Sequence, residues 1–149
     1  MVMLSAPGFP AANIGELIKL AKASPGSINV AIPSSTARVV LEMLAISSDS
    51  RYKDIPYKGS SAAVSDLLGG HVQLSIDTAM AATTLVSNGK LKALGVSTLK
   101  PTAVLPGVGT FAESGLAGFD LAAWNVWFAP AATPPEIVAR LNAEIRAVL

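Results

Sequence analysis

Three short polar segments carry the side chains of this chain that could do chemistry. Each follows an apolar segment and precedes residues with helical spacing, so each places hydroxyls and backbone N–H groups at the start of a helix. The amino end of a helix attracts anions, because its first N–H groups have no acceptor within the helix and the dipole is positive there. The candidate ligand-binding residues are Ser34, Ser35 and Thr36 in the first segment, Gly59 and Ser60 in the second, and Asp77 and Thr78 in the third.

Each segment also has a purely structural interpretation. One hydroxyl of residues 34–36 is enough to cap the following helix. Asp77 could accept a hydrogen bond from a ligand, or it could cap a helix that begins at Ala79. Arg38 stands in the first helical turn after residues 34–36, and we expect it to face solvent rather than an anion. Residues 58–61 lack the spacing of a P-loop, so nucleotide binding is poorly supported.

These residues do not form a recognisable catalytic set. No serine stands in a G-x-S-x-G motif. His71 is the sole histidine, and we expect it to be exposed at the start of a strand, at the opposite end from Ser34 and Ser35. The chain has no cysteine, which excludes a Cys-ligated zinc, and one histidine excludes a His-based metal cluster. No cofactor is expected.

Composition excludes further classes. The 149 residues suffice for one domain, and they are 51% hydrophobic and 14% charged, with a net charge of +1. The basic residues are scattered rather than clustered, which argues against nucleic-acid binding. No apolar run approaches the ~18 residues of a membrane span, and residues 1–12 lack the pattern of a secretory signal.

The elements that must position the polar segments alternate between strand and helix. This order is typical of an α/β domain with a mainly parallel sheet and helices on both faces. Because parallel strands end at the same edge of a sheet, the three polar segments should lie together there. Strands are predicted at residues 28–32, 53–57, 72–76 and 91–96, and helices at 14–23, 37–46, 60–68, 79–86 and 135–149.

The last part of the chain has a different pattern. Residues 121–128 are extended and apolar, and Trp124 and Trp127 should point to opposite faces, one into the core and the other toward a cleft or a partner. The helix after them has an apolar stripe without an obvious partner in the preceding domain. We expect it either to fold back on its own domain or to form a homodimer by exchange of residues 121–149. The stripe contains Ile137, Leu141, Ile145 and Val148.

Five segments, in order, resemble the Bug-type receptors, which are the extracytoplasmic solute-binding proteins of the tripartite tricarboxylate transporter family. The resemblance spans nearly the whole chain. Its motifs are LIKLAKASPG at 17–26, IPYKGSSAAVSDLLGGHVQLSID at 55–77, GKLKALGVS at 89–97, LPGVGTFAESG at 105–115, and the helix entry from Trp124 to Pro134 with EIV at 136–138.

The resemblance implies a periplasmic-binding-protein type II fold, in which two α/β lobes enclose a ligand cleft. Residues 1–120 would be the second, ligand-binding lobe, and residues 121–149 would be the crossing strand and C-terminal helix of an otherwise missing first lobe. The loop at 33–36 matches the family's ligand site, but it lacks the usual glycine, and Arg38 stands where the family has a histidine.

The resemblance also implies a function. The chain would capture a small carboxylate for the membrane components of a tripartite transporter, without reacting with it. Its location would be the periplasm, or the cytoplasm if Met1 is the natural start. Two alternatives are the effector-sensing domain of a transcription regulator and, less favoured, a hydrolase that uses Ser34 or Ser35.

Overall fold

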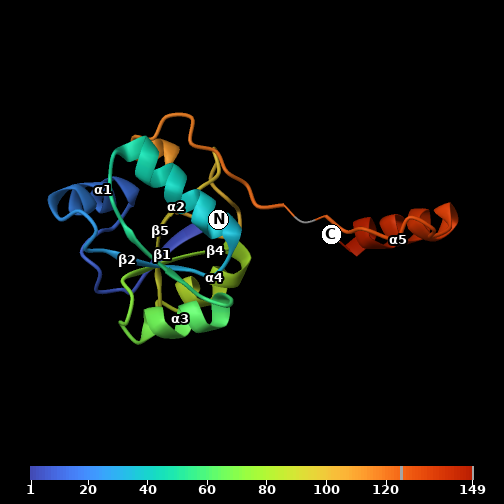
Figure 1. Cartoon of the computed structure of the whole chain (residues 1–149), viewed down its shortest axis with the longest axis horizontal. Helices are drawn as coiled ribbons and strands as arrows, with labels where there is room; N and C mark the ends of the chain where they lie inside the picture. Colours follow the sequence, from blue (N-terminus) through green and yellow to red (C-terminus); the bar gives the residue numbers. More distant parts are fainter. Residues whose placement is uncertain (125, 149) are drawn as a thin grey trace.

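A five-stranded sheet in the order β3-β2-β4-β1-β5 organises the chain. The computed structural model describes residues 1–124 and 126–148 (Figure 1). The four predicted strands all form, with bounds that differ by one or two residues. The strands are β1 Val2–Ser5, β2 Asn29–Ile32, β3 Lys53–Pro56, β4 Leu74–Asp77 and β5 Lys92–Val96.

Four of the five strands run in the same direction, as predicted, but the sheet is mixed because it contains a strand, β1, that the sequence did not reveal. β2 pairs in parallel with β3 and β4, whereas β1 pairs antiparallel with β4 and β5. All four residues of β1 are buried. A wholly buried strand shows no alternation of polar and apolar residues, so periodicity could not identify β1. Because β1 is antiparallel, Met1 lies at the edge where the parallel strands end.

Helices cover both faces of the sheet, which confirms the prediction. Figure 1 shows α1 and α2 on one side of the strands and α3 and α4 on the other. The two buried clusters follow this division, since Val40 of α2 belongs to one and Ala82 of α4 to the other. The helices are α1 Ile14–Ala23, α2 Ser35–Ser48, α3 Ser60–Leu68 and α4 Ala79–Ser87, and a short 3₁₀ helix, η1, spans Ala112–Ser114.

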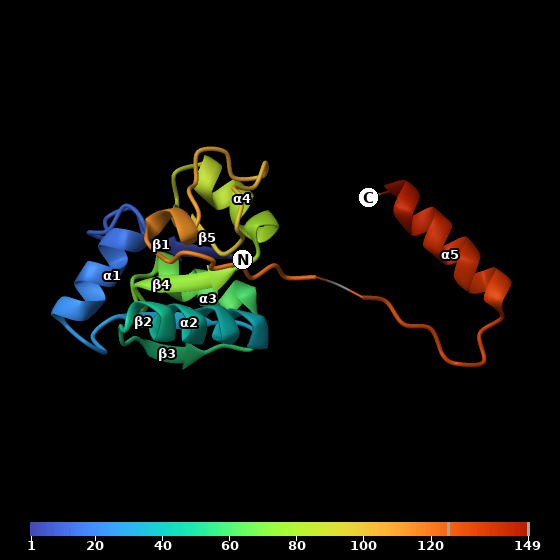
Figure 2. The ribbon, with the colours of Figure 1, turned by 90° about the horizontal axis from the view of Figure 1, so that it is seen from above.

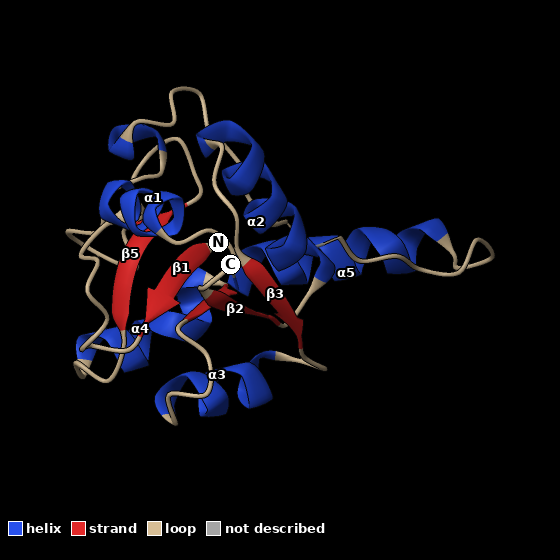
Figure 3. Ribbon diagram, turned by 60° about the vertical axis from the view of Figure 1, so that its left-hand side comes forward, coloured by secondary structure: helices blue, strands red, loops and turns tan. Residues whose placement is uncertain are grey.

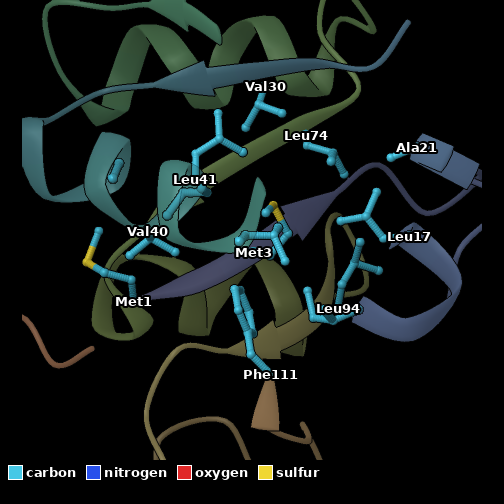
Figure 4. Close-up of a cluster of buried hydrophobic side chains, with 14 of the residues drawn as sticks. Met1, Met3, Leu17, Ala21, Val30, Val40, Leu41, Leu74, Leu94 and Phe111 are labelled. Atoms are coloured by element: carbon cyan, nitrogen blue, oxygen red, sulfur yellow. The ribbon is translucent and has the colours of Figure 1, made fainter. Parts of the chain in front are cut away.

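The core on the α1–α2 side contains side chains from these two helices, from the sheet and from the segment after β5 that carries Phe111 (Figure 4). Phe111 is fully buried there, and its ring lies 4.9 Å from that of Phe119 between centroids. Gly95 of β5 allows α1 to approach, because a Cβ at this position would lie 2.6 Å from Cγ1 of Ile14. Leu17 and Met3 complete this part of the core.

The C-terminal arm, residues 121–124 and 126–148, leaves the lobe. Figures 1 and 2 show it extending away and ending in α5, Pro135–Val148, none of whose described residues is buried. Trp124 and Trp127 are 78% and 72% exposed, so the prediction that one of them is core is wrong. Asn125 and Leu149, which fall in the predicted segments, lie outside the described residues.

The expectation that the arm folds back on its own lobe is also wrong for this structure. The four helices α1 to α4 cover the two faces of the sheet (Figure 3), and no described residue of α5 is buried. The arm is attached at Leu121, whose N–H donates to the carbonyl of Ser97 at 2.7 Å. None of the described helices is long and apolar enough to cross a membrane.

Candidate carboxylate-binding edge

The helical connections of the sheet change from one face to the other between β2 and β4. These strands are neighbours, but α2, which follows β2, covers one face, whereas α4, which follows β4, covers the other. Ligands of open α/β sheets bind at such a switch point, outside the carboxyl ends of the strands. We call the edge formed by the ends of β2, β3 and β4 the carboxyl edge. All three predicted polar segments lie along it, and Ser35 and Asp77 are at the same end of the sheet.

At the first segment, Ser34 is the N-cap of α2, and its hydroxyl accepts a hydrogen bond from the N–H of Ala37 at 3.2 Å. Helix capping therefore occupies one hydroxyl of the three. Ser35 is exposed and Thr36 is half-buried in the first helical turn, where backbone N–H groups have no acceptor within the helix. This end of α2 combines hydroxyl donors with the positive end of the helix dipole.

Arg38 does not simply face solvent, as the sequence suggested. Its guanidinium forms an ion pair with the carboxylate of Asp54 on β3, and the two side chains are 47% and 40% exposed. The aspartate neutralises the cation that would otherwise oppose the dipole in the first turn of α2.

Removing this ion pair should have a small effect. Arg38→Gln should change the free energy of unfolding by less than about 1 kcal/mol, because an exposed pair is screened by water and salt. Urea denaturation of Arg38→Gln, Asp54→Asn and the double variant measures the coupling directly. A coupling well above that value, unchanged at high salt, would show that the pair is more buried than described.

The second segment starts α3 at Gly59, which has a φ of 154° and provides no side-chain cap. The first N–H groups of α3 therefore lack both a helical acceptor and a capping oxygen. The hydroxyl of Tyr57, just after β3, donates to Oδ2 of Asp66 in α3 at 2.6 Å and holds the strand end against the helix. This hydrogen bond raises the pKa of Tyr57 above its ordinary value, because it stabilises the protonated phenol beside a carboxylate.

At the third segment, Thr78 rather than Asp77 caps α4. The Thr78 hydroxyl accepts from the N–H of Ala81 at 3.3 Å, so the interpretation of Asp77 as the cap is wrong. Asp77 is the last residue of β4 and is only 3% exposed. Its Oδ1 accepts from the N–H of Thr78 at 2.7 Å, while its Oδ2 is buried without a partner among the described residues. Asp77 therefore orients the loop on which Thr78 stands.

A hollow of about 450 Å³ opens beside α4 at this edge. Of the predicted residues only Thr78 lines it, together with Met1, Thr98, Thr102 and Met80. Thr98 was not predicted from the sequence, although it fits the same pattern of a polar residue after a parallel strand. Met1 was missed because β1 was missed.

A larger hollow of about 650 Å³ lies elsewhere, between α1, the end of α2 and η1. Side chains of both charges line it, among them Glu16, Lys19, Lys22 and Glu113. It is away from the strand ends and contains no predicted residue. Size alone does not make it the better site, because a mixed-charge surface offers no net attraction for an anion.

His71 is exposed and precedes β4, whereas Ser34 and Ser35 follow the end of β2, which runs parallel to β4. The histidine and the serines are thus at opposite ends of the sheet. A hydrolase would need them within hydrogen-bonding reach. The geometry therefore argues against the hydrolase alternative.

Comparison with known proteins identifies the family. A model of the tripartite tricarboxylate transporter family receptor, TctC, matches residues 1–149. The chain belongs to this receptor family. The resemblance to Bug-type receptors is confirmed, since Protein BugT of Bordetella pertussis is 32% identical over 151 residues, which cover 100% of this chain and 46% of BugT.

Two solved proteins have the same fold. Rpa4515 of R. palustris, solved with adipate, gives a TM-score of 0.90 at 30% identity, over 95% of this chain and 48% of its own. MatC of Rhodopseudomonas palustris, solved with bound malate, gives 0.86 at 29% identity, over 98% of this chain and 50% of its own. These matches confirm the periplasmic-binding-protein lobe that the sequence predicted. The chain thus spans about half the length of these TctC-family proteins.

Proposed function

We propose that this chain forms the ligand-binding lobe of a periplasmic receptor that captures a small carboxylate and delivers it to the membrane components of a tripartite transporter. One observation carries the proposal. The amino ends of α2, α3 and α4 all open at the carboxyl edge, beside the switch point of the sheet. Three sets of helix N–H groups and dipoles thus favour anionic groups along this edge.

Neutral hydrogen-bond donors suffice to bind a carboxylate at this edge. The hydroxyls of Ser35, Thr36 and Ser60 and the first N–H groups of the helices supply hydrogen bonds, and the Arg38 charge is already paired with Asp54. Binding through neutral donors keeps the ligand releasable, which a receptor needs. The sole histidine, His71, lies at the opposite end of the sheet from these serines, which supports a role in which the bound molecule is not transformed.

The ligand class follows from chemistry and from relatives. An edge with several separate anion sites suits a molecule with two carboxylates, and the two solved proteins described above were solved with adipate and malate. We infer that the ligand is a small dicarboxylate. The transcription-regulator alternative has no observation in its favour, whereas the family match supports transport.

The C-terminal arm belongs to a different lobe in this proposal. We propose that residues 1–120 are the second lobe and form one wall of the cleft, and that residues 121–149 belong to the first lobe, which supplies the other wall. Two observations support this division: α5 exposes its apolar residues, with Leu141 51% exposed, and the match to Rpa4515 spans 95% of this chain but 48% of that protein. Exchange of residues 121–149 between two copies is the alternative, and it predicts a discrete dimer in sedimentation velocity that Leu141→Asp dissociates.

Calorimetric titration with adipate and with malate tests the function. We expect one-to-one binding with a Kd in the millimolar range, or about −4 kcal/mol, because a single wall cannot exclude water from the ligand. Adipamide, which lacks the charges, should not bind. Micromolar or tighter binding would show that the lobe alone completes the site. Equal binding of adipamide and adipate would show that the site does not recognise negative charge. Turnover of an ester at Ser34 or Ser35 would contradict a purely binding role.

A further inference from the structure

Two buried oxygen atoms behind the carboxyl edge have no hydrogen-bond partner among the described residues. They are Oδ2 of Asp77 and Oγ of Ser75, and both residues belong to β4. Asp77 is 3% exposed and Ser75 is fully buried. A buried polar atom without a partner is costly, and the cost is greater for a charged group. Two such atoms in one strand therefore need an explanation.

The two side chains point to the same face of the sheet. They are two residues apart in a strand, where alternate side chains share a face and lie about 6–7 Å apart along the backbone. Their neighbours Leu74 and Ile76 belong to the cluster on the α1–α2 side, so Ser75 and Asp77 point toward α3 and α4. They also lie too far apart along the strand to be expected to bond each other directly.

The surroundings on that face are apolar, and Leu4 and Val2 of β1 lie opposite Ser75 and Asp77 on one side. Ala31 of β2 lies directly opposite Ser75 in the parallel register, and Ala63 of α3 and Ala82 of α4 belong to the same buried cluster. Because alanine occupies little volume, we expect room for a molecule the size of water toward these three residues rather than toward β1. An internal site that offers two polar partners meets the conditions under which proteins hold buried water.

We propose that an ordered water molecule binds between Ser75 and Asp77 and positions the carboxyl edge. The Ser75 hydroxyl donates to the water, and the water donates to Oδ2 of Asp77, because an ionised carboxylate only accepts. With Oδ1 already held by the N–H of Thr78, both oxygens of Asp77 are then fixed. The water therefore sets the position of the loop that starts α4.

This role makes Ser75 a positioning residue, since it acts on the ligand only through water, Asp77 and Thr78. The part of the inference that concerns ligand affinity rests on the proposed function, whereas the water site itself does not. Ser5 offers a matched control. Its hydroxyl is also buried without a partner among the described residues, but it lies opposite Leu74 and so on the other face of the sheet.

A high-resolution crystal structure of the chain tests the site. We expect a water oxygen within about 2.6–3.2 Å of both Ser75 Oγ and Asp77 Oδ2. In Ser75→Ala this water should be lost or displaced, and in Ser5→Ala it should stay. If Ser75→Ala does not fold, Ser75→Cys replaces it, because a thiol is a weak donor of similar size. A dry site in the wild type, or a protein donor on Oδ2 of Asp77, would overturn the inference.

Titration with adipate then tests positioning. Ser75→Ala should weaken binding about tenfold, as expected for one hydrogen bond to a charged group, whereas Ser5→Ala should bind like the wild type. Equal affinity in both variants, with the water lost only from Ser75→Ala, would reject the positioning role. A wild type that holds the water but binds no dicarboxylate would reject the proposed function and leave the water site standing.

Discussion

Phe111→Ala will lower the free energy of unfolding by about 3–5 kcal/mol, which is the usual cost of removing a buried aromatic ring. The ring is fully buried and contacts a cluster built from both α1 and the sheet. It also packs on Phe119. Its loss leaves a cavity that α1 cannot fill, because Ile14 already lies against Gly95. Urea denaturation followed by circular dichroism measures the change.

Phe128→Ala is the matched control. Phe128 lies in the C-terminal arm and is 88% exposed, so its truncation should leave the stability of the lobe within about 0.5 kcal/mol of the wild type. A similar loss for both variants would mean that the arm packs on the lobe in solution. The division between lobe and arm would then be wrong.

Ser35→Glu should reduce affinity for a dicarboxylate by at least tenfold while leaving the fold intact. The new carboxylate would stand in the first turn of α2, at the carboxyl edge. Two like charges about 4 Å apart repel by about 4 kcal/mol at an effective dielectric constant of 20, and solvent exposure reduces this value. The same charge favours the amino end of the helix by about 0.3–1 kcal/mol. Affinity should therefore fall while stability stays equal or rises.

Ser47→Glu provides the control for this experiment. Ser47 is exposed in the last turns of α2, at the opposite end from Ser35. The Ser47→Glu variant adds the same net charge far from the carboxyl edge, so its affinity for the dicarboxylate should stay near that of the wild type. It should lower stability slightly, because a negative charge opposes the dipole there. An equal loss of affinity in both variants would indicate a general charge effect rather than a local site.

Much of the lobe could be predicted because its signals are local. Asn13 is of a type that favours the N-cap position, and its side chain accepts from the N–H of Glu16 at 2.9 Å at the start of α1. Gly69 is the C-cap of α3, and glycine is a common signal for the end of a helix. The strands β2 to β5 are short and alternate with helices along the chain, an order that is typical of parallel strands.

The features that were missed depend on distant partners. β1 is recognisable only from β4 and β5 on either side, since four buried residues have no period of their own. The ion pair between Arg38 and Asp54 joins residues of different elements. The exposure of Trp124 and Trp127 depends on where the arm leaves the lobe. Local patterns carry no information about these contacts.

At the candidate site, sequence and structure agree on placement but differ on individual roles. The rule that parallel strands end at one edge brought the three polar segments together. It could not tell which side chain caps each helix, and Thr78 takes the role that Asp77 could have had. It also could not show that Asp77 is buried, because burial depends on the packing around β4.

The central claim is that dicarboxylates bind at the carboxyl edge. Titration of ¹⁵N-labelled chain with adipate, followed through backbone amide NMR signals, tests it most directly and detects weak binding. The account predicts that the largest shift changes occur at the amides of Ser35, Thr36, Ser60 and Ala79, which open the three helices at this edge, with little change at His71. Largest changes around His71, or no change at any amide up to saturating adipate, would contradict it.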